Sequence, residues 1–451
     1  MTFWNGLVTG PVVHERTGPD GTGSLSRTAL AKATAGRLDC AAMSSPEAAI
    51  PETAIELTPR QRLVSLTAAI SGVLGVGIAF GAAIPLITLL MEGRGYSPLV
   101  IGLNGAMFPL AVLITAPFVP KLLGRFGTLR MMTIVLAIGI AMLMVFPATD
   151  AIALWFVARF VMGLTGAVHW ITTEAWINTL AGDRSRGRVM GFYAAALGIG
   201  FAGGPVLLKL VGFDGWAPFL CIAVCLVLAA APLLFARGLA PAMSEHPDGG
   251  ALRTLLVAPT VLTAALAAGA IDSGLYLLLP IFAVENGFDR EMTATWLTVW
   301  IAGTIFLQPP LGWLVDRFDA RKMLVAIAVL VMVGMIALPY LWGGGIVFWI
   351  VTFLWGGVIL GIYTVGIVLL GRRFRGTQIA AANAGFVMVY EIGAIVGPVS
   401  IGASMDRFGA NGIVPVVVAM CAIFMAIALW RIHLAARGRN TGDDGPLPPQ
   451  A

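Results

Sequence analysis

The chain has 451 residues, of which 58% are hydrophobic and 11% charged, and its mean hydropathy is +0.90. This composition excludes a water-soluble globular protein, whose residues are about 25% charged. The formal net charge of +5 does not indicate nucleic-acid binding, because the basic residues stand in short loops beside apolar runs. The four cysteines include no C-x-x-C pair and the histidines form no cluster, so we expect no metal site and no cofactor.

The first part of the chain lacks an apolar period. Residues 1–60 are rich in Gly, Ala, Thr and Pro, and we expect them to be disordered. They contain no visible secretory signal. Met43 opens a polar leader directly before the first apolar run, and we expect translation to start there.

Twelve apolar segments come next, each close to or above the ~20 residues that a helix needs to cross a bilayer. Polar stretches that hold most of the charge separate them. The sequence therefore predicts an all-α membrane protein in contact with lipid. The expected helices cover residues 64–91, 98–121, 129–147, 151–180, 188–211, 215–236, 254–284, 292–315, 322–341, 345–371, 378–404 and 411–434.

Lysine and arginine test this count, because cytoplasmic loops carry the excess of basic residues. With twelve helices, nineteen basic residues fall on the side that holds both chain ends. The opposite side has only Arg94, Lys209, Arg290 and Arg407. We therefore predict both termini in the cytoplasm of a bacterial inner membrane, since a missed helix would reverse the later loops and remove this bias.

Two motifs repeat along the chain with nearly the same offset. LLGRFGTLRMM at 122–132 resembles LVDRFDARKML at 314–324, which lies 192 residues later. The Gly-Pro pairs that end at Pro205 and Pro398 are 193 residues apart. A repeat of about six helices is typical of transporters built from two parallel halves, which bind substrate between the halves near the bilayer midplane.

The repeat divides the chain into parts. We expect two six-helix bundles at residues 61–236 and 254–437. A cytoplasmic linker at 237–253 joins them, and residues 438–451 form a disordered tail.

The loop after the eighth segment carries a recognisable pattern. It reads Gly312-x-x-x-Asp316-Arg317-x-x-x-Arg321-Lys322 and resembles the loop signature of the major facilitator superfamily. The copy in the first half has Pro120 and Gly124 where the signature has Gly and Asp. The resemblance covers residues 60 to 435 and implies two pseudo-symmetric six-helix bundles that move a substrate by alternating access.

Two further motifs resemble the same superfamily. Arg159-x-x-x-Gly163-x-x-x-Ala167 in the fourth segment is similar to its arginine motif. The glycines of the fifth segment, with Gly200 and Gly204-Pro205, are similar to its antiporter motif, although Leu208 and Lys209 replace the closing glycine pair. The stretches RFVMGLTGAVHWITTEAW and SRGRVMGFY also resemble the YcaD-like branch.

Few ionisable groups lie inside the predicted spans, and each costs roughly 3 kcal/mol to insert, so each is a functional candidate. Arg159 can bind an anionic substrate or a titrating carboxylate, or it can cap backbone carbonyls of neighbouring helices. Asp272 lies among small residues with Tyr276 one turn later. Burial disfavours the charged form of a carboxylate, which suits it to proton coupling, although a purely structural hydrogen bond also explains Asp272.

The other candidates carry closer alternatives. Glu391 is a proton carrier or gate, or one partner of an ion pair with an arginine at the cytoplasmic side. Glu174 is part of the substrate or proton pathway, or it pairs with the basic loop at 184–188. His169 is more often a packed polar residue than a proton relay.

The remaining candidates line a pocket or serve gating. The pocket candidates combine aromatic stacking with hydrogen bonding, and they are Trp170, Trp176, Tyr193, Tyr276, Tyr363, Asn383 and Tyr390. Charges of the loop signature can form breakable contacts that lock one access state, and glycines let helices slide or bend. The gating candidates are Asp316, Arg317, Arg321, Gly200, Gly204, Pro205, Gly397 and Pro398.

These observations favour a monomeric, proton-coupled secondary transporter of a small molecule. The antiporter-like motif favours export by antiport, and uptake by proton symport stays a rival. A sensor or scaffold with a transporter fold is the alternative of another class, but it has no reason to keep central charges. No G-x-x-x-x-G-K-[ST] loop occurs, which disfavours an ATP-driven pump or an enzyme, and a lipid flippase of the same fold stays open.

Overall fold

The computed structural model describes residues 58–180, 186–234, 257–343, 345–374 and 377–437. Several predictions fall outside these residues: the disorder of 1–60 over residues 1–57, the start at Met43, the linker at 237–253 and the tail at 438–451. The pairing of Glu174 with the basic loop at 184–188 also involves side chains outside the described part of the chain. The chain divides into two compact units, residues 1–63 and residues 64–451, and the second unit contains the apolar segments.

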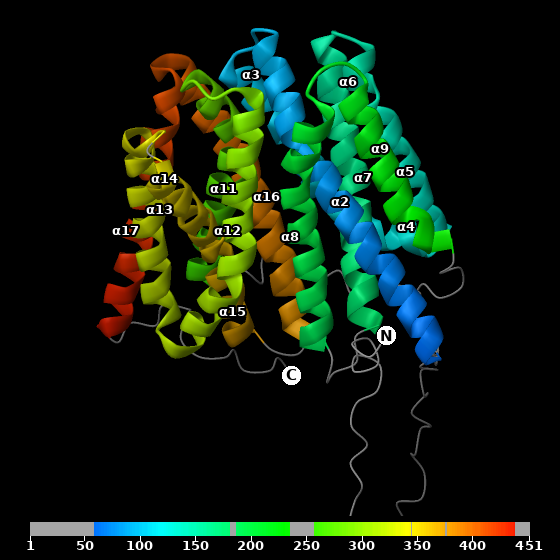
Figure 1. Cartoon of the computed structure of the whole chain (residues 1–451). Coiled ribbons are helices and arrows are strands. Elements are labelled where there is room, and N and C mark those ends of the chain that lie inside the picture. Colours follow the sequence, from blue (N-terminus) through cyan, green and yellow to red (C-terminus); the bar gives the residue numbers. More distant parts are fainter. Residues whose placement is uncertain (1–57, 181–185, 235–256, 344, 375–376, 438–451) are drawn as a thin grey trace, which may run out of the picture. The chain divides into compact units, whose positions relative to one another are not determined.

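The described part of the second unit is helical throughout (Figure 1). Its α-helices, including α2, which begins in the first unit, are α2 (Pro59–Gly93), α3 (Pro98–Thr115), α4 (Val119–Phe126), α5 (Thr128–Leu143), α6 (Val145–Ala148), α7 (Ile152–Leu180), α8 (Arg186–Val211), α9 (Ala217–Ala230), α11 (Pro259–Glu285), α12 (Arg290–Arg317), α13 (Ala320–Leu341), α14 (Gly345–Ile359), α15 (Gly361–Arg373), α16 (Thr377–Phe408) and α17 (Ile413–Ala436). Short 3-10 turns occur at Ala116–Phe118, Ala231–Leu234 and Ala410–Gly412.

The predicted all-α membrane architecture is confirmed. Eleven helices in the described residues are long and apolar enough to cross a membrane, and a shorter apolar helix spans Ala217–Leu233. Together they match the twelve predicted segments in order. Some segments are interrupted: the second contains a 3-10 turn at Ala116–Phe118, where Pro117 removes a backbone donor, and the tenth is divided at Leu360 into α14 and α15.

Close helix crossings within each half explain the glycines of the repeat. Gly204 of α8 lies against the backbone of Gly81 in α2, and Gly397 of α16 lies against the backbone of Ala270 in α11. A side chain at either glycine would collide with the neighbouring main chain. The repeat-related helices α8 and α16 therefore pack on the first helix of their own half in the same way.

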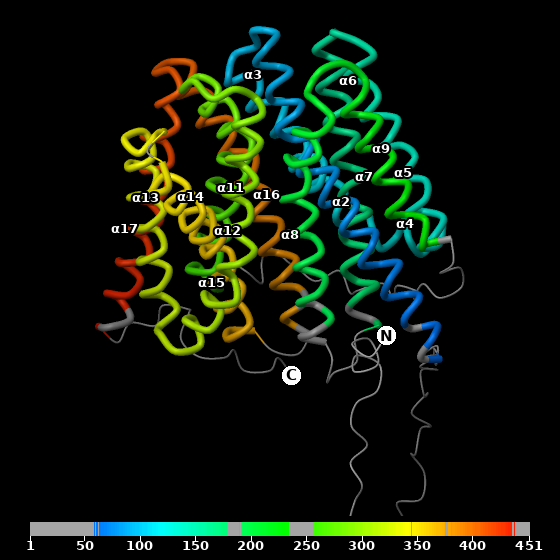
Figure 2. The backbone as a smooth tube through the Cα atoms, in the orientation of Figure 1, coloured from blue at the N-terminus to red at the C-terminus, as the bar shows by residue number. Residues whose placement is uncertain are grey.

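The two halves meet along two repeat-related helix pairs. Figure 2 shows α8 beside α12, while α16 packs against both α11 and α3. Gly102 of α3 approaches the carbonyl of Pro398, and Gly198 of α8 faces the side chain of Ile305 in α12. Helices α3, α8, α12 and α16 thus form the interface at which a substrate site is expected.

Candidate functional site

A hydrogen bond between two helices holds the carboxylate of Asp272. The Tyr390 hydroxyl of α16 donates to Oδ2 of Asp272 in α11 over 2.8 Å. The Tyr390 ring also meets the Tyr363 ring of α15 edge to face at 5.5 Å between centroids, and Phe386 contacts Tyr363 in the same way at 5.3 Å. The small residue Gly269 permits this contact, because it lets the main chain of α11 approach the carbonyl of Tyr390.

Tyr363 lies within electrostatic range of carboxylates from both halves, namely Glu174 in α7, Glu391 in α16 and Asp272 in α11. Tyr193 of α8 is in turn within range of Glu174 and Tyr363. We call these groups the acidic tyrosine cluster, which consists of Glu174, Tyr193, Asp272, Tyr363, Tyr390 and Glu391.

The cluster is partly accessible. Glu174, Asp272, Tyr363, Tyr390 and Glu391 are half-buried, whereas Tyr193 is buried. Glu391 makes no hydrogen bond or ion pair with the described residues. Trp170 lies one turn before Glu174, interacts with its carboxylate and exposes 37% of its own surface. The cluster therefore combines acidic and aromatic groups that keep partial exposure, while Tyr363 and Tyr390 also pack against the apolar core.

Arg159 occupies a different level of the bundle. It lies fifteen residues before Glu174 in α7, which corresponds to about 22 Å along the helix axis. Its side chain is buried, and its Nε–H finds no acceptor in the described part of the chain. Gly163, one turn later, packs against Phe108 and Ala111 of α3, so this face of α7 points into the bundle.

An aromatic row connects the halves through Tyr276. Successive rings of the row lie 5.1 to 6.3 Å apart between centroids. In order, the row consists of Phe108, Phe80, Phe201, Tyr276 and Trp300. Tyr276 of α11 reaches the first half, where its hydroxyl donates to the carbonyl of Gly81 at 3.5 Å. The sequence predicted Tyr276 as a pocket residue, but it gave no reason to select the phenylalanines, because apolar rings are common in spans.

The remaining pocket candidates are less connected. Asn383 lies two turns before Tyr390, is half-buried, and hydrogen-bonds to none of the described residues. Trp176 is fully buried and its Nε1–H donates to Ser65, which indicates packing. The sequence did not predict one polar pair: the Thr364 hydroxyl of α15 donates to Gln308 Oε1 of α12 over 2.5 Å. The presence of a glutamine inside an apolar segment could have indicated it.

His169 is buried in the first half. It lines a cavity of about 70 Å³ between α2, α5, α7 and α9, whose other lining residues are mostly apolar. Its Nε2 has no hydrogen-bond partner among the described residues. This position separates His169 from the acidic tyrosine cluster. No group of three or more metal-ligating side chains occurs in the described residues.

The loop signature makes contacts within the second half. Asp316 is 3.9 Å from Arg372 of α15, and Arg372 also donates to the carbonyl of Val315. The guanidinium of Arg317 stacks on the ring of Trp313 in the same helix, 3.7 Å from its centroid. The backbone N–H of Arg321 donates to Asp319, which caps α13. A contact of Arg317 across the half interface stays a prediction for another access state.

Two repeat-related carboxylates join the halves at the end where α3 and α12 begin, the upper end in Figure 1. Asp406 of α16 accepts hydrogen bonds from the Ser97 hydroxyl at 2.9 Å and the Leu99 N–H at 3.1 Å, at the start of α3. Asp214, after α8, pairs with Arg290 at the start of α12 over 2.9 Å. Asp214 and Asp406 are 192 residues apart, so the same offset relates both contacts, which we call the two latches.

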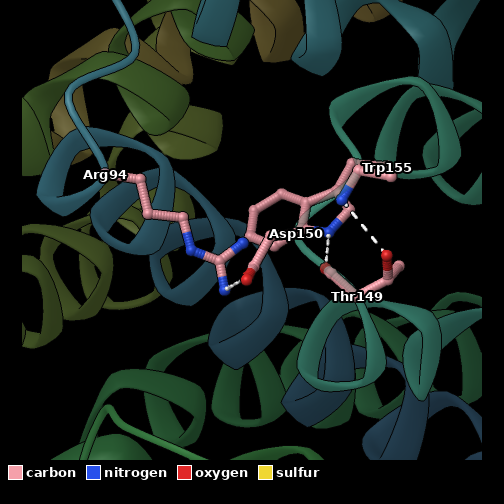
Figure 3. Close-up of polar contacts among 5 residues, drawn as sticks. Arg94, Thr149, Asp150 and Trp155 are labelled. Carbon is pink, nitrogen blue, oxygen red and sulfur yellow. Dashed lines mark hydrogen bonds and ion pairs between the residues drawn. The ribbon is translucent and has the colours of Figure 1, made fainter.

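The same end of the first half has an internal contact of its own. Figure 3 shows Arg94 paired with Asp150 at 2.7 Å while its guanidinium lies over the Trp155 ring, 4.4 Å from the centroid. The Trp155 Nε1–H donates to the carbonyl of Thr149. This network ties the end of α2 to the start of α7 and does not cross between halves.

Comparison with known proteins agrees with this arrangement. The Major Facilitator Superfamily profile matches residues 69–297 and 261–450. The uncharacterized MFS-type transporter YfkF of Bacillus subtilis (strain 168) is 24% identical over 365 residues, which cover 78% of this chain and 92% of YfkF. YcaD of Escherichia coli O17:K52:H18, also an uncharacterized MFS-type transporter, is 23% identical over 61% of this chain and 72% of YcaD.

Solved structures share the fold at low sequence identity. A bacterial homolog of the human lysosomal transporter Spinster, in an inward-facing and unoccupied conformation, has a TM-score of 0.69 at 15% identity and covers 87% of this chain and 100% of its own. The nucleoside transporter NupG, in a mutant form, has a TM-score of 0.68 at 12% identity over 81% of this chain and 99% of its own.

In the described residues, eleven apolar helices of spanning length and one shorter apolar helix form two repeated halves, which is the architecture of a multi-pass membrane transporter. The match of the superfamily profile across most of the chain makes the assignment specific: the chain belongs to the major facilitator superfamily, whose members are transporters and not enzymes. The predicted resemblance to this family and to its YcaD-like members is therefore confirmed.

Proposed function

We propose that the protein is a proton-coupled secondary transporter of the bacterial inner membrane that exports a small molecule by antiport. The observation that carries this proposal is the half-buried Asp272 carboxylate, which Tyr390 holds between α11 and α16 beside carboxylates of both halves. A carboxylate within a span costs insertion energy, so its presence indicates a function. Binding and release of a proton is a function that suits a half-buried carboxylate.

Asp272 and Glu391 are the proposed proton carriers. Glu391 has no hydrogen-bond or ion-pair partner among the described residues, so a structural ion pair with a described arginine does not explain it. Both lie near the middle of their helices, thirteen and fourteen residues after the start of α11 and α16. Protonation of both removes charge near the half interface, which favours rocking of the halves.

The direction of transport and the membrane orientation belong to the same proposal. The antiporter-like glycines of α8 favour export, and the basic residues favour a cytoplasmic location of both termini. Proton symport is the second candidate, because Leu208 and Lys209 replace the closing glycine pair of the antiporter motif. A D-xylose-proton symporter shares the fold, with a TM-score of 0.61 over 82% of this chain. That structure is 14% identical and supports the fold alone.

Proteoliposomes test proton coupling before the substrate is known. A pH-sensitive dye inside the vesicles reports proton movement as each compound of a chemically broad panel is added, with and without an imposed pH gradient. We expect at least one compound to drive proton flux in the parent protein. Asp272→Asn and Glu391→Gln should each lower that flux at least tenfold, because neither amide carries a proton at neutral pH.

Glu291→Gln is the matched control, since this exposed glutamate lies in the first turn of α12, outside the acidic tyrosine cluster. It should retain parental flux. Substrate flux that does not depend on the pH gradient would contradict proton coupling. Undiminished coupling in both Asp272→Asn and Glu391→Gln would contradict the choice of carriers.

A further inference from the structure

We infer that the substrate is an organic cation with an aromatic or otherwise apolar body, bound at the acidic tyrosine cluster. This inference rests on the proposed transport function and adds the substrate class. It starts from the charge of the cluster. Glu174, Asp272 and Glu391 supply three carboxylates near Tyr363, and none of them forms an ion pair with a described basic residue.

The nearest arginine within the same helix does not balance this charge. Arg159 lies about 22 Å from Glu174 along α7. Arg372, at the end of α15, already contacts Asp316 and the carbonyl of Val315. An anionic substrate would face repulsion from three carboxylates in a weakly polar environment, whereas a cation would be attracted to them.

The rings of the cluster point to the shape of that cation. Tyr363 stands at the centre of an edge-to-face group with Tyr390 and Phe386. Trp170, beside Glu174, leaves 37% of its surface exposed. Faces of tyrosine and tryptophan attract organic cations through their quadrupoles, and apolar bodies gain from burial against them.

A neutral sugar-like substrate fits these residues less well. Sugars are recognised by several side-chain amides and hydroxyls, and Asn383 is the one amide of α16 near Tyr390. The Gln308 side chain already bonds Thr364 and the carbonyl of Gly357. Charge and aromatic surface, not a hydrogen-bonding set for hydroxyls, dominate the cluster.

A cation and a proton would then compete for the same carboxylates. Binding of one cation to the charged form of Asp272 or Glu391 excludes protonation of that group, and protonation weakens the site for the cation. Because the proton and the substrate use one set of groups in turn, the cluster favours exchange of the two over movement in the same direction.

The test is equilibrium binding of two probes of nearly equal size and opposite charge, tetraphenylphosphonium and tetraphenylborate, to the purified full-length protein in nanodiscs. Empty nanodiscs measure the lipid background. We expect saturable binding of tetraphenylphosphonium and at least tenfold weaker binding of tetraphenylborate. Glu174→Gln and Glu391→Gln should each weaken tetraphenylphosphonium at least fivefold, and binding should fall as the pH is lowered.

Asp272→Glu, which keeps the charge, should bind more tightly than Asp272→Asn, and Glu291→Gln should bind like the parent. Size-exclusion elution and thermal unfolding identify any variant that does not fold. Absence of tetraphenylphosphonium binding, preference for the borate, or affinity unchanged in both glutamine variants would overturn the inference.

The outcome is separable from the test of proton coupling. Proton flux driven by a neutral or anionic compound of the panel, without cation binding, would refute the substrate class and leave coupling intact. Binding of the cation by a protein that moves no protons would refute coupling and leave the binding class intact.

Discussion

At the scale of single residues, the structure shows which partners the charged side chains contact. Asp272 and Tyr390 were separate candidates in the sequence, 118 residues apart, and they share one hydrogen bond. Such a bond to a charged group stabilises it by about 1.5–3 kcal/mol, and its loss leaves a half-buried oxygen unpaired. Tyr390 therefore helps to fix the position of Asp272.

The Tyr390 hydroxyl can be removed without loss of the ring. Tyr390→Phe keeps the ring contact with Tyr363 and loses only the bond to Asp272. We expect proton-coupled flux to fall about tenfold, because roughly 1.4 kcal/mol corresponds to a factor of ten in rate. Initial rates in the dye assay measure the change.

Tyr340→Phe serves as the control, since Tyr340 is 87% exposed and the substitution removes the same atom elsewhere. Equal flux in Tyr390→Phe and the parent would mean that the hydroxyl has a packing role alone.

The sequence predicted most members of the site but not their grouping. Intramembrane charge picked out Asp272, Glu391, Glu174 and Arg159, because insertion cost makes each exceptional. The separation of Arg159 from Glu174 follows from their spacing in α7, whereas the grouping of Glu174 with Asp272 and Glu391 depends on how α7, α11 and α16 pack. Phe80 and Phe201 carry no such signal, and only the packing of α2, α8 and α11 reveals their row.

At the scale of helices, glycine sets how closely two elements approach. Gly200 and Gly204 of α8 face the backbone of α2, and Gly393 and Gly397 of α16 face the backbone of α11. The helix pairs are held by main-chain van der Waals contact over these stripes. A repeated Gly-Pro pair in the sequence predicted two equivalent helices, but it did not identify their partners.

A matched pair of substitutions in one helix tests this packing. Gly204→Ala places a methyl group against the main chain of Gly81 and Ala82, whereas a Cβ at Gly191 meets nothing within 4 Å. We expect Gly204→Ala to destabilise the protein by about 1–3 kcal/mol. The midpoint of thermal unfolding in detergent should fall for Gly204→Ala and stay unchanged, or rise slightly, for Gly191→Ala.

Equal unfolding midpoints for the two variants would show that α2 and α8 shift apart without loss, so that the glycines are not required for close packing.

At the scale of the whole molecule, the two latches favour the state in which the halves meet at the end where α3 and α12 begin. Asp406 accepts from the Leu99 N–H at the start of α3, and Asp214 pairs with the Arg290 side chain at the start of α12. The dipole at each helix start also favours negative charge. With both termini in the cytoplasm, as proposed, this end faces the outer side of the membrane. The halves must break both contacts to open there.

Latch removal should therefore shift the resting state. Asp406→Ala together with Asp214→Ala removes exposed charged contacts that contribute about 0.2–1 kcal/mol each, so the population open at this end should rise several-fold. Spin labels at Ala151→Cys and Ile346→Cys, both exposed and in different halves, report the distance across the opening in a cysteine-free background.

Asp150→Ala is the control, because it breaks the 2.7 Å ion pair with Arg94 at the same end within one half. It should leave the label distance unchanged. An unaltered distance distribution in the double latch variant would refute a role of these carboxylates in closure.

The correspondence of Asp214 and Asp406 also bears on the evolutionary origin of the two halves. If both halves descend from one duplicated six-helix ancestor, the two carboxylates were once a single residue. Each carboxylate now contacts the half to which it does not belong. Two copies of that ancestor, related by a twofold axis along the membrane normal, would have been joined by one self-complementary contact made twice. Gene fusion then allowed Ser97 and Arg290 to diverge into different partners for what began as the same acid.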